Sequence, residues 1–137
     1  MTDQGSGSGT GHERPQDPDD LGRLFLLRAN AGDVDGVVAL YEPGAVLAGP
    51  PGQLTTGSAA IRAVYQQLLA DRPAFTGDVQ PAIRLGDLAL TSTRFDIITT
   101  TTDGRITTVR TATTEIARRQ PDGTWLWAVD QPNVLAP

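Results

Sequence analysis

The side chains of this chain that could do chemistry are carboxylates, hydroxyls, arginines and indoles, because the stronger nucleophiles are almost absent. Among its 137 residues there is no cysteine and a single histidine, His12. One histidine in a Gly- and Ser-rich N-terminal segment excludes Ser–His–Asp and Cys–His sites, and with them a zinc or iron site built on histidine. The stretch GSGSG at 5–9 does not lie between a strand and a helix, so it is not a phosphate loop. We expect neither a metal nor a cofactor.

Asp130 is the first carboxylate of interest. It stands at the end of the last predicted strand, directly before Gln131-Pro132. In a pocket that raised its pKa, such a carboxylate could act as a general base on an acidic C–H bond of a carbonyl compound. Alternatively it pairs with a backbone amide or an arginine where the sheet ends, since capping and ion pairing also perturb carboxylates.

Glu115 is the second carboxylate, and the strand face on which it lies decides its role. Alternation places Thr111, Thr113 and Glu115 on one face of a strand. Both faces mix polar and apolar residues, so the pattern leaves open which of them lines an interior. On the sequence alone we favour the exterior, where Glu115 would form a cross-strand ion pair with Arg94 or Arg118.

The two tryptophans of the chain lie two residues apart on the last predicted strand. Alternation puts Trp125 and Trp127 on one face and Asp130 on the other, unless a β-bulge intervenes. Two indoles on one strand face indicate a packing surface, and we predict a homodimer that associates through the sheet face.

The elements that must position these side chains are of two kinds. In the first half, apolar residues recur at helical spacing, which predicts three helices over about 18–31, 34–42 and 58–72. Asp33 and Ser58 are the expected caps of the second and third helices, and short strands at 45–48 and 53–56 separate these two.

The second half consists of four β-rich runs, at about 75–85, 87–101, 105–119 and 124–131. Asp103-Gly104 is a hairpin signal between two of them. Helices followed by an antiparallel meander predict an α+β fold, in which the three helices cover one face of a long sheet.

This order of elements, and four segments of the sequence, resemble the NTF2-like superfamily, in its SnoaL-like and ketosteroid-isomerase-like branch. The segments are NAGDVDG at 30–36, VALY at 38–41, GSAAIR at 57–62, and RQPDGTW at 119–125 with VDQP at 129–132. The resemblance implies a cone-shaped fold, with three N-terminal helices packed on a strongly curved, mixed and mostly antiparallel sheet that encloses a pocket. We predict this domain for residues 18–134, preceded by a disordered tail, residues 1–17, that has almost no apolar side chains.

The resemblance also bears on activity. In SnoaL-like cyclases a late-strand Asp is the general acid/base, which makes Asp130 the expected catalytic residue. The three active positions of the ketosteroid isomerase fall on Phe25, Gly49 and Thr114, none of which keeps the group that the isomerase uses. Steroid isomerisation is therefore not carried over, and a non-catalytic binding or dimerisation domain is the alternative.

The ligand implied by the pocket is a hydrophobic small molecule. The residues expected to bind it are Phe25, Gly49, Tyr65, Thr111, Thr113, Glu115 and Trp127.

Charge excludes two other classes of partner. The net charge is -5, and the 11 basic residues, all arginine, are scattered along the chain. Binding to nucleic acid or to an anionic membrane requires a concentrated positive surface, so we expect neither. No apolar run is long enough to span a membrane and no signal peptide is visible, so we expect a cytoplasmic protein.

Overall fold

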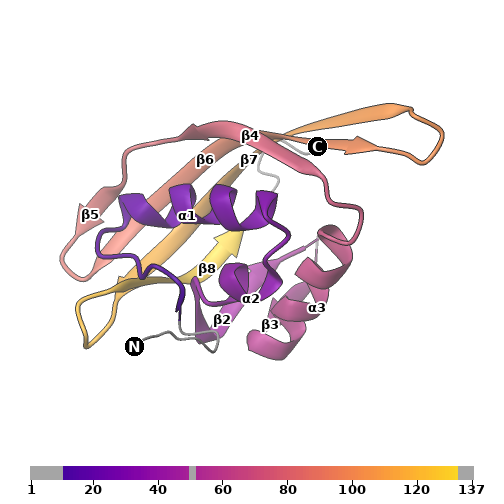
Figure 1. Ribbon diagram of the computed structural model, residues 1–137. Helices are drawn as coiled ribbons and strands as arrows, with labels where there is room; N and C mark the ends of the chain where they lie inside the picture. The colour runs from indigo at the N-terminus through magenta and orange to yellow at the C-terminus, as the bar shows by residue number, and fades with distance from the viewer. Residues whose placement is uncertain (1–10, 50–51, 133–137) are drawn as a thin grey trace.

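The computed structural model describes residues 11–49 and 52–132 (Figure 1). The helices in this part of the chain are α1 (Asp19–Asn30), α2 (Val34–Val38) and α3 (Ser58–Leu68). They lie together on one side of the sheet, as Figure 1 shows. None of the described helices is long and apolar enough to cross a membrane.

The described strands form one seven-stranded sheet. They are β2 (Tyr41–Ala48), β3 (Leu54–Thr56), β4 (Ala74–Val79), β5 (Ile83–Leu85), β6 (Leu88–Thr100), β7 (Ile106–Arg119) and β8 (Trp125–Gln131). Their order is β3-β2-β8-β7-β6-β4, and β5 also pairs with β6. The β2–β8 pair is parallel and the other pairs are antiparallel. The sheet is therefore open and mixed, and the predicted α+β class is confirmed.

The three predicted helices are present, with corrections to two of them. α3 ends at Leu68, short of the predicted 72, and its N-cap is Gly57 without a side-chain cap hydrogen bond, so the expected cap Ser58 is wrong. Asp33 caps α2 as expected, accepting a hydrogen bond of 2.9 Å from the backbone N–H of Gly36. The second helix ends at Val38, however, and Tyr41 begins β2 instead of lying on the helix. The reason is pairing with β8, since the N–H of Trp127 donates to the carbonyl of Leu40 at 2.8 Å.

The predicted run 75–85 is two strands, β4 and β5. The break contains Pro81, which has no N–H to donate to a ladder. Beyond β4 the N–H of Gln80 still donates to the carbonyl of Ser92 on β6, at 3.0 Å. β6 therefore pairs with two short strands along its length, with β5 at residues 88–90 and with β4 at residues 93–98.

A β-bulge in β8 sets which side chains face the helices. Trp127 pairs with Ala117 and Val129 pairs with Ile116, so Ala128 has no partner on β7. The extra residue shifts the alternation and puts Trp127 and Asp130 on the same face.

The tryptophan pair does not form an exposed packing surface. Trp125 and Trp127 are 5% and 2% exposed and belong to the core beneath the helices. The packing surface that the two indoles predict is therefore the core of the domain itself, and the homodimer through the sheet face stays a prediction.

The core lies between the helices and the inner face of the sheet. Leu21 and Leu24 of α1 are fully buried in it. Phe25 stands at the centre of an aromatic group, with ring centroids 5.9–6.1 Å from four others. Edge and tilted ring pairs of this kind add about 0.5–1.5 kcal/mol each beyond the burial of their area.

Part of the predicted disordered tail is ordered. Residues 1–10 lie outside the described residues, but residues 11–17 run against the domain. The buried guanidinium of Arg28 donates to the carbonyl oxygens of Glu13 and Gly36, and the carbonyl of Pro15 accepts from the N–H of Trp125 at 2.9 Å. These backbone acceptors, which hydropathy does not register, order the segment.

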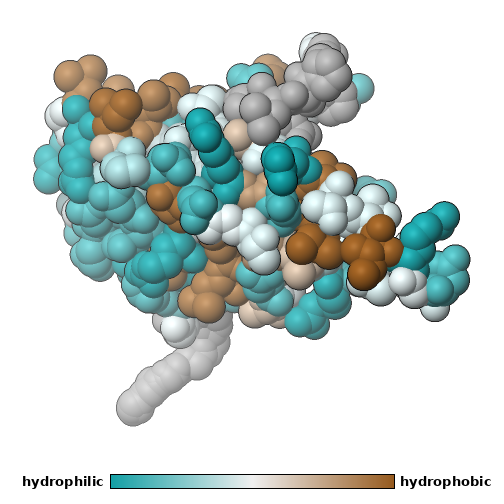
Figure 2. All heavy atoms as spheres, turned by 90° about the horizontal axis from the view of Figure 1, so that it is seen from above, coloured by the Kyte–Doolittle hydropathy of each residue, from teal (hydrophilic) through white to brown (hydrophobic). Residues whose placement is uncertain are grey.

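Figure 2 shows the molecule from above. Apolar side chains are exposed at β5, at the left of this view, and along the β6–β7 hairpin that projects to the right. Ile83 and Leu85 of β5 are 68% and 78% exposed, and Ile106 of the hairpin is 67% exposed.

Candidate functional site

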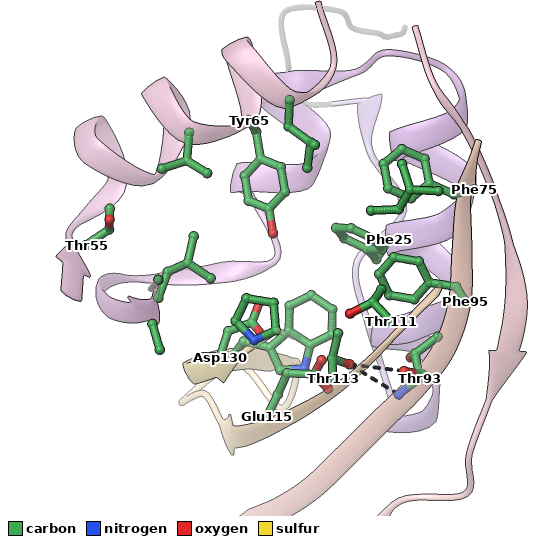
Figure 3. A pocket seen from close by; sticks show the side chains of 18 of the residues that line it. Phe25, Thr55, Tyr65, Phe75, Thr93, Phe95, Thr111, Thr113, Glu115 and Asp130 are labelled. Atoms are coloured by element: carbon green, nitrogen blue, oxygen red, sulfur yellow. Dashed lines mark hydrogen bonds between the residues drawn. The ribbon is translucent and has the colours of Figure 1, made fainter. Parts of the chain in front are cut away.

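A cavity of about 370 Å³ lies between helices α1 and α3 and the inner face of β2, β6, β7 and β8 (Figure 3). All eight residues that the sequence singled out for the site line this cavity. They are Phe25, Gly49, Tyr65, Thr111, Thr113, Glu115, Trp127 and Asp130. The structure thus brings all eight residues together in one cavity, whereas their roles in binding or catalysis stay predictions.

One wall of the cavity is aromatic. Phe25 of α1, Phe75 of β4 and Phe95 of β6 gather on one side in Figure 3, and Tyr65 of α3 faces them from above. The ring of Trp127 also lines the cavity, with its centroid 6.1 Å from that of Phe25. Each of these elements turns its ring inward because its opposite face meets solvent. The wall therefore offers flat apolar surfaces to a ligand.

The lining of the cavity also includes two carboxylates. Glu115 and Asp130 are direct cross-strand partners on β7 and β8. Each is only 4% exposed. Residues directly opposite in an antiparallel pair have Cβ atoms about 5 Å apart, so the two acids share one microenvironment.

Asp130 has one engaged and one free oxygen. Its Oδ2 accepts a 2.5 Å hydrogen bond from the hydroxyl of Tyr41, which lies 2.6 Å from the hydroxyl of Tyr65. Its Oδ1 is buried and has no hydrogen-bond partner among the described residues. A buried, unsatisfied carboxylate oxygen costs folding free energy, so its presence in a residue that lines a cavity calls for a functional reason.

Glu115 is held by a chain of side chains. Its Oε1 accepts a 2.6 Å hydrogen bond from the Thr91 hydroxyl, and the Thr91 oxygen in turn accepts from the indole N–H of Trp127 at 3.0 Å. The exterior ion pair that we favoured from the sequence is wrong, because Glu115 faces inward. Arg118, one proposed partner, pairs with Glu42 at 2.9 Å instead.

Burial keeps both acids from ionising easily. It raises the pKa of Glu115 to about 8, assisted by the neighbouring charge of Asp130 and partly offset by hydroxyls of Thr113 and Thr91. Burial also raises the pKa of Asp130, to about 6, against the opposing hydrogen bond from Tyr41. Near neutral pH the pair therefore holds one proton between its two members.

The tyrosines beside the acids stay neutral. Burial, followed by the charge of Asp130, raises the pKa of Tyr41 and of Tyr65. Both hydroxyls therefore act as hydrogen-bond donors or acceptors and not as phenolates at physiological pH.

Two of the three active positions implied by the family resemblance line the cavity. Phe25 and Gly49 line the cavity, and Gly49, whose N–H donates to the carbonyl of Gln53, presents no side chain there. Thr114 is not among the lining residues, because alternation turns it to the outer face. Its neighbours Thr113 and Glu115 occupy the inner positions.

Sequence reasoning missed three polar residues of the site. Tyr41 was placed on a helix, and Thr91 and Thr93 were not singled out, although all three are buried. Tyr41 and Thr91 donate hydrogen bonds to the two carboxylates, and Thr93 lines the cavity. The strand alternation that assigned Thr111 and Thr113 to one face carries the same signal for Thr91 and Thr93. For Tyr41 no comparable signal exists in the sequence.

Among the described residues no group of three or more His, Cys, Asp or Glu side chains could hold a metal ion.

Comparison with solved structures finds the same fold in other proteins. A ketosteroid isomerase-like protein from Erwinia carotovora atroseptica SCRI1043 is 19% identical with a TM-score of 0.75, over 87% of this chain and 94% of that one. A protein of the NTF2-like family from Streptomyces avermitilis is 17% identical with a TM-score of 0.70, over 85% and 93% of the two chains. An NTF2-like protein with a cystatin-like fold from Novosphingobium aromaticivorans is 21% identical with a TM-score of 0.68, over 86% and 79%.

At these identities the likeness concerns the fold alone. A comparison with curated proteins gave no match. The family model of the SnoaL-like domain, however, matches residues 23–127, which include most of the cavity lining. The chain belongs to the SnoaL-like domain family, and it has the fold of the NTF2-like proteins compared above.

Proposed function

We propose that this protein binds a hydrophobic carbonyl compound in the cavity and catalyses its isomerisation or cyclisation, with Asp130 as the acid/base. The observation that carries the proposal is the Oδ1 atom of Asp130, a residue that lines the aromatic cavity: this oxygen is buried and has no partner among the described residues. A general base must present a free oxygen to the proton that it takes, in a place where water does not compete.

The proposed step is a proton transfer. Oδ1 of Asp130 takes a proton from the carbon next to the carbonyl, the C–H electron pair moves toward the carbonyl oxygen, and Asp130 then returns the proton to another carbon. The raised pKa of Asp130 brings its basicity close to physiological pH. The protonated Glu115, its cross-strand neighbour, is a donor for the oxygen that gains charge. Such a step transfers no electrons to a second molecule, so it needs no redox cofactor.

A second candidate is a non-catalytic binding protein with the same cavity. Its support is the chemistry of Phe25 and Gly49, which line the cavity at positions where the resemblance places a hydroxyl donor and a base. Neither side chain can move a proton. In this case Asp130 and the threonine hydroxyls only orient a ligand.

Exchange of hydrogen for deuterium separates the two candidates without knowledge of the product. Hydrophobic ketones are incubated with the protein in D₂O, and proton NMR follows the signal of the carbon next to the carbonyl. We expect exchange with the unaltered protein and a loss of about 100-fold or more in Asp130→Asn. Asp96→Asn is the matched control, because Asp96 is paired with Arg110 outside the cavity.

Binding of ketones without any exchange would support the non-catalytic candidate. Exchange that persists in Asp130→Asn would show that another group is the base and would overturn the assignment.

We also infer that the outer face of the sheet associates with a second copy. Ile83, Leu90, Ile116 and Val129 follow one another in cross-strand register, and all are at least 40% exposed. The described helices lie on the opposite face and leave this apolar row uncovered (Figure 1). Light scattering should give the mass of a dimer at micromolar concentration, and a monomer there would contradict the inference.

A further inference from the structure

The charged side chains that line the cavity are all acidic. Its two ionisable acids are Glu115 and Asp130, and its other polar lining groups are hydroxyls, amides and backbone. No arginine is among the lining residues in the described chain. Arg84, Arg110 and Arg118 form ion pairs elsewhere in the molecule.

The acid pair carries about one negative charge near neutral pH, with nothing in the described lining to balance it. Oδ1 of Asp130 can only accept hydrogen bonds when ionised, and neither of its lone pairs is used by the described residues. The chemistry that would complete this site is a positively charged donor from the ligand.

The rest of the cavity suits the same ligand. The rings of Phe25, Tyr65, Phe75, Phe95 and Trp127 all line it. Aromatic faces attract a cation within about 6 Å, and they also cover an apolar ligand body. A carboxylate beside several rings is a combination that stabilises an ammonium group removed from water, whereas it repels a carboxylate on the ligand.

We propose that the ligand of this cavity is an apolar, ring-containing amine, whose ammonium group donates to Oδ1 of Asp130 within the aromatic wall. The inference rests on the proposed function only in that the cavity takes a hydrophobic small molecule. It is compatible with the proton transfer, because Oδ1 has a second lone pair for a neighbouring C–H bond. The substrate would then be a hydrophobic carbonyl compound that carries a basic nitrogen.

Three probes that differ only in their polar group test the inference. Naphthylethylamine, naphthylethanol and naphthylacetate are titrated into the full chain near neutral pH and followed by calorimetry. We expect the amine to bind about tenfold or more tightly than the alcohol, because a charge-assisted hydrogen bond replaces a neutral one. The acetate should bind most weakly of the three.

Two variants locate the preference. In Asp130→Asn the amine should lose its advantage while the alcohol still binds. In Asp96→Asn, which removes a carboxylate outside the cavity, all three dissociation constants should stay as they are. The comparison of probes on the unaltered protein remains a complete test if Asp130→Asn fails to fold.

An alcohol that binds as tightly as the amine would overturn this inference and leave the hydrophobic cavity of the proposed function standing. An amine preference that survives in Asp130→Asn would also overturn it. If none of the three probes, nor the same series with a phenyl ring, binds, the proposed function fails together with the inference.

Discussion

Four neighbouring strands of this sheet carry two rows of side chains that differ by one residue in sequence and lie on opposite faces. The inner row is Thr91, Glu115, Asp130 and Leu47, in cross-strand register on β6, β7, β8 and β2. The outer row is Leu90, Ile116, Val129 and Val46, in the same register. Both acids lie in the inner row, whereas the outer row is entirely apolar.

Sheets covered on one face by helices ordinarily show the reverse pattern, apolar toward the core and polar toward water. A one-residue shift would restore that order, since it exchanges the two faces. The inversion places buried acids in the protein and leaves exposed apolar side chains on its surface, and both are unfavourable for an isolated domain. Both become favourable when a ligand fills the inner side and a partner covers the outer side.

The largest effect that we expect is a dependence of the free energy of unfolding on pH, caused by the two acids of the inner row. In the native state the pKa values of Glu115 and Asp130 are raised to about 8 and about 6, while in the unfolded chain both lie near 4. Between about pH 4 and 8 the native state therefore binds more protons, and the free energy of unfolding falls as the pH rises. Each unit of raised pKa corresponds to about 1.4 kcal/mol, so the total loss reaches several kcal/mol.

Urea unfolding at about pH 5 and about pH 8 measures this loss. The double variant Asp130→Asn/Glu115→Gln removes both titrations and should lose far less stability over the same interval. Tyr41 of β2 and Tyr65 of α3 also face the pair, but burial raises their pKa values and keeps them neutral throughout. Equal losses in the two proteins would show that the acids are not the source.

We expect a smaller loss of stability when the Thr91 hydroxyl, which links Glu115 to Trp127, is removed. Thr91→Val keeps the shape of the side chain but leaves the indole N–H of Trp127 and Oε1 of Glu115 without their shared partner. Each unsatisfied buried group costs about 1–3 kcal/mol, so the free energy of unfolding should fall by about that amount or more.

Thr107→Val is the matched control for this substitution. Thr107 is exposed on the projecting hairpin of β6 and β7, and its substitution should change the free energy of unfolding by less than about 0.5 kcal/mol. If Thr91→Val were equally mild, the hydroxyl would not be holding Glu115, and the fixed geometry of the pair would be in doubt.

The inverted rows also explain what could be predicted from the sequence. Alternation placed Thr111, Thr113 and Glu115 on one face, and the structure has them there. Both faces of this strand mix polar and apolar residues, so alternation left open which face is buried, and Glu115 was expected outside in an ion pair with Arg94 or Arg118. The alternation of side chains along a strand is encoded locally, but which of its two faces is buried was decided by packing against the helices.

Two other features depended on contacts that no local pattern encodes. The bulge at Ala128, which brings Asp130 to the face of Trp127, has no glycine or proline to mark it. The start of β2 at Tyr41 follows from pairing of Leu40 with Trp127, whereas the sequence predicted a helix over 34–42. Long-range pairing thus decided where the acid and its tyrosine donor lie, and propensity did not.

The smallest effect on the fold should come from the outer row. Ile116→Thr keeps β-branching and strand propensity at a side chain that is 42% exposed, so the free energy of unfolding of the monomer should change by about 0.5 kcal/mol or less. If the outer row binds a second copy, the same substitution weakens that contact at its centre, since Ile116 stands between Leu90 and Val129. Sedimentation of the two proteins over a range of concentrations measures it: the variant should dissociate at higher concentration than the unaltered chain. A substitution that leaves both stability and dissociation unchanged would mean that the apolar outer row is not an interface, and the inversion would then have only its inner, ligand-binding explanation.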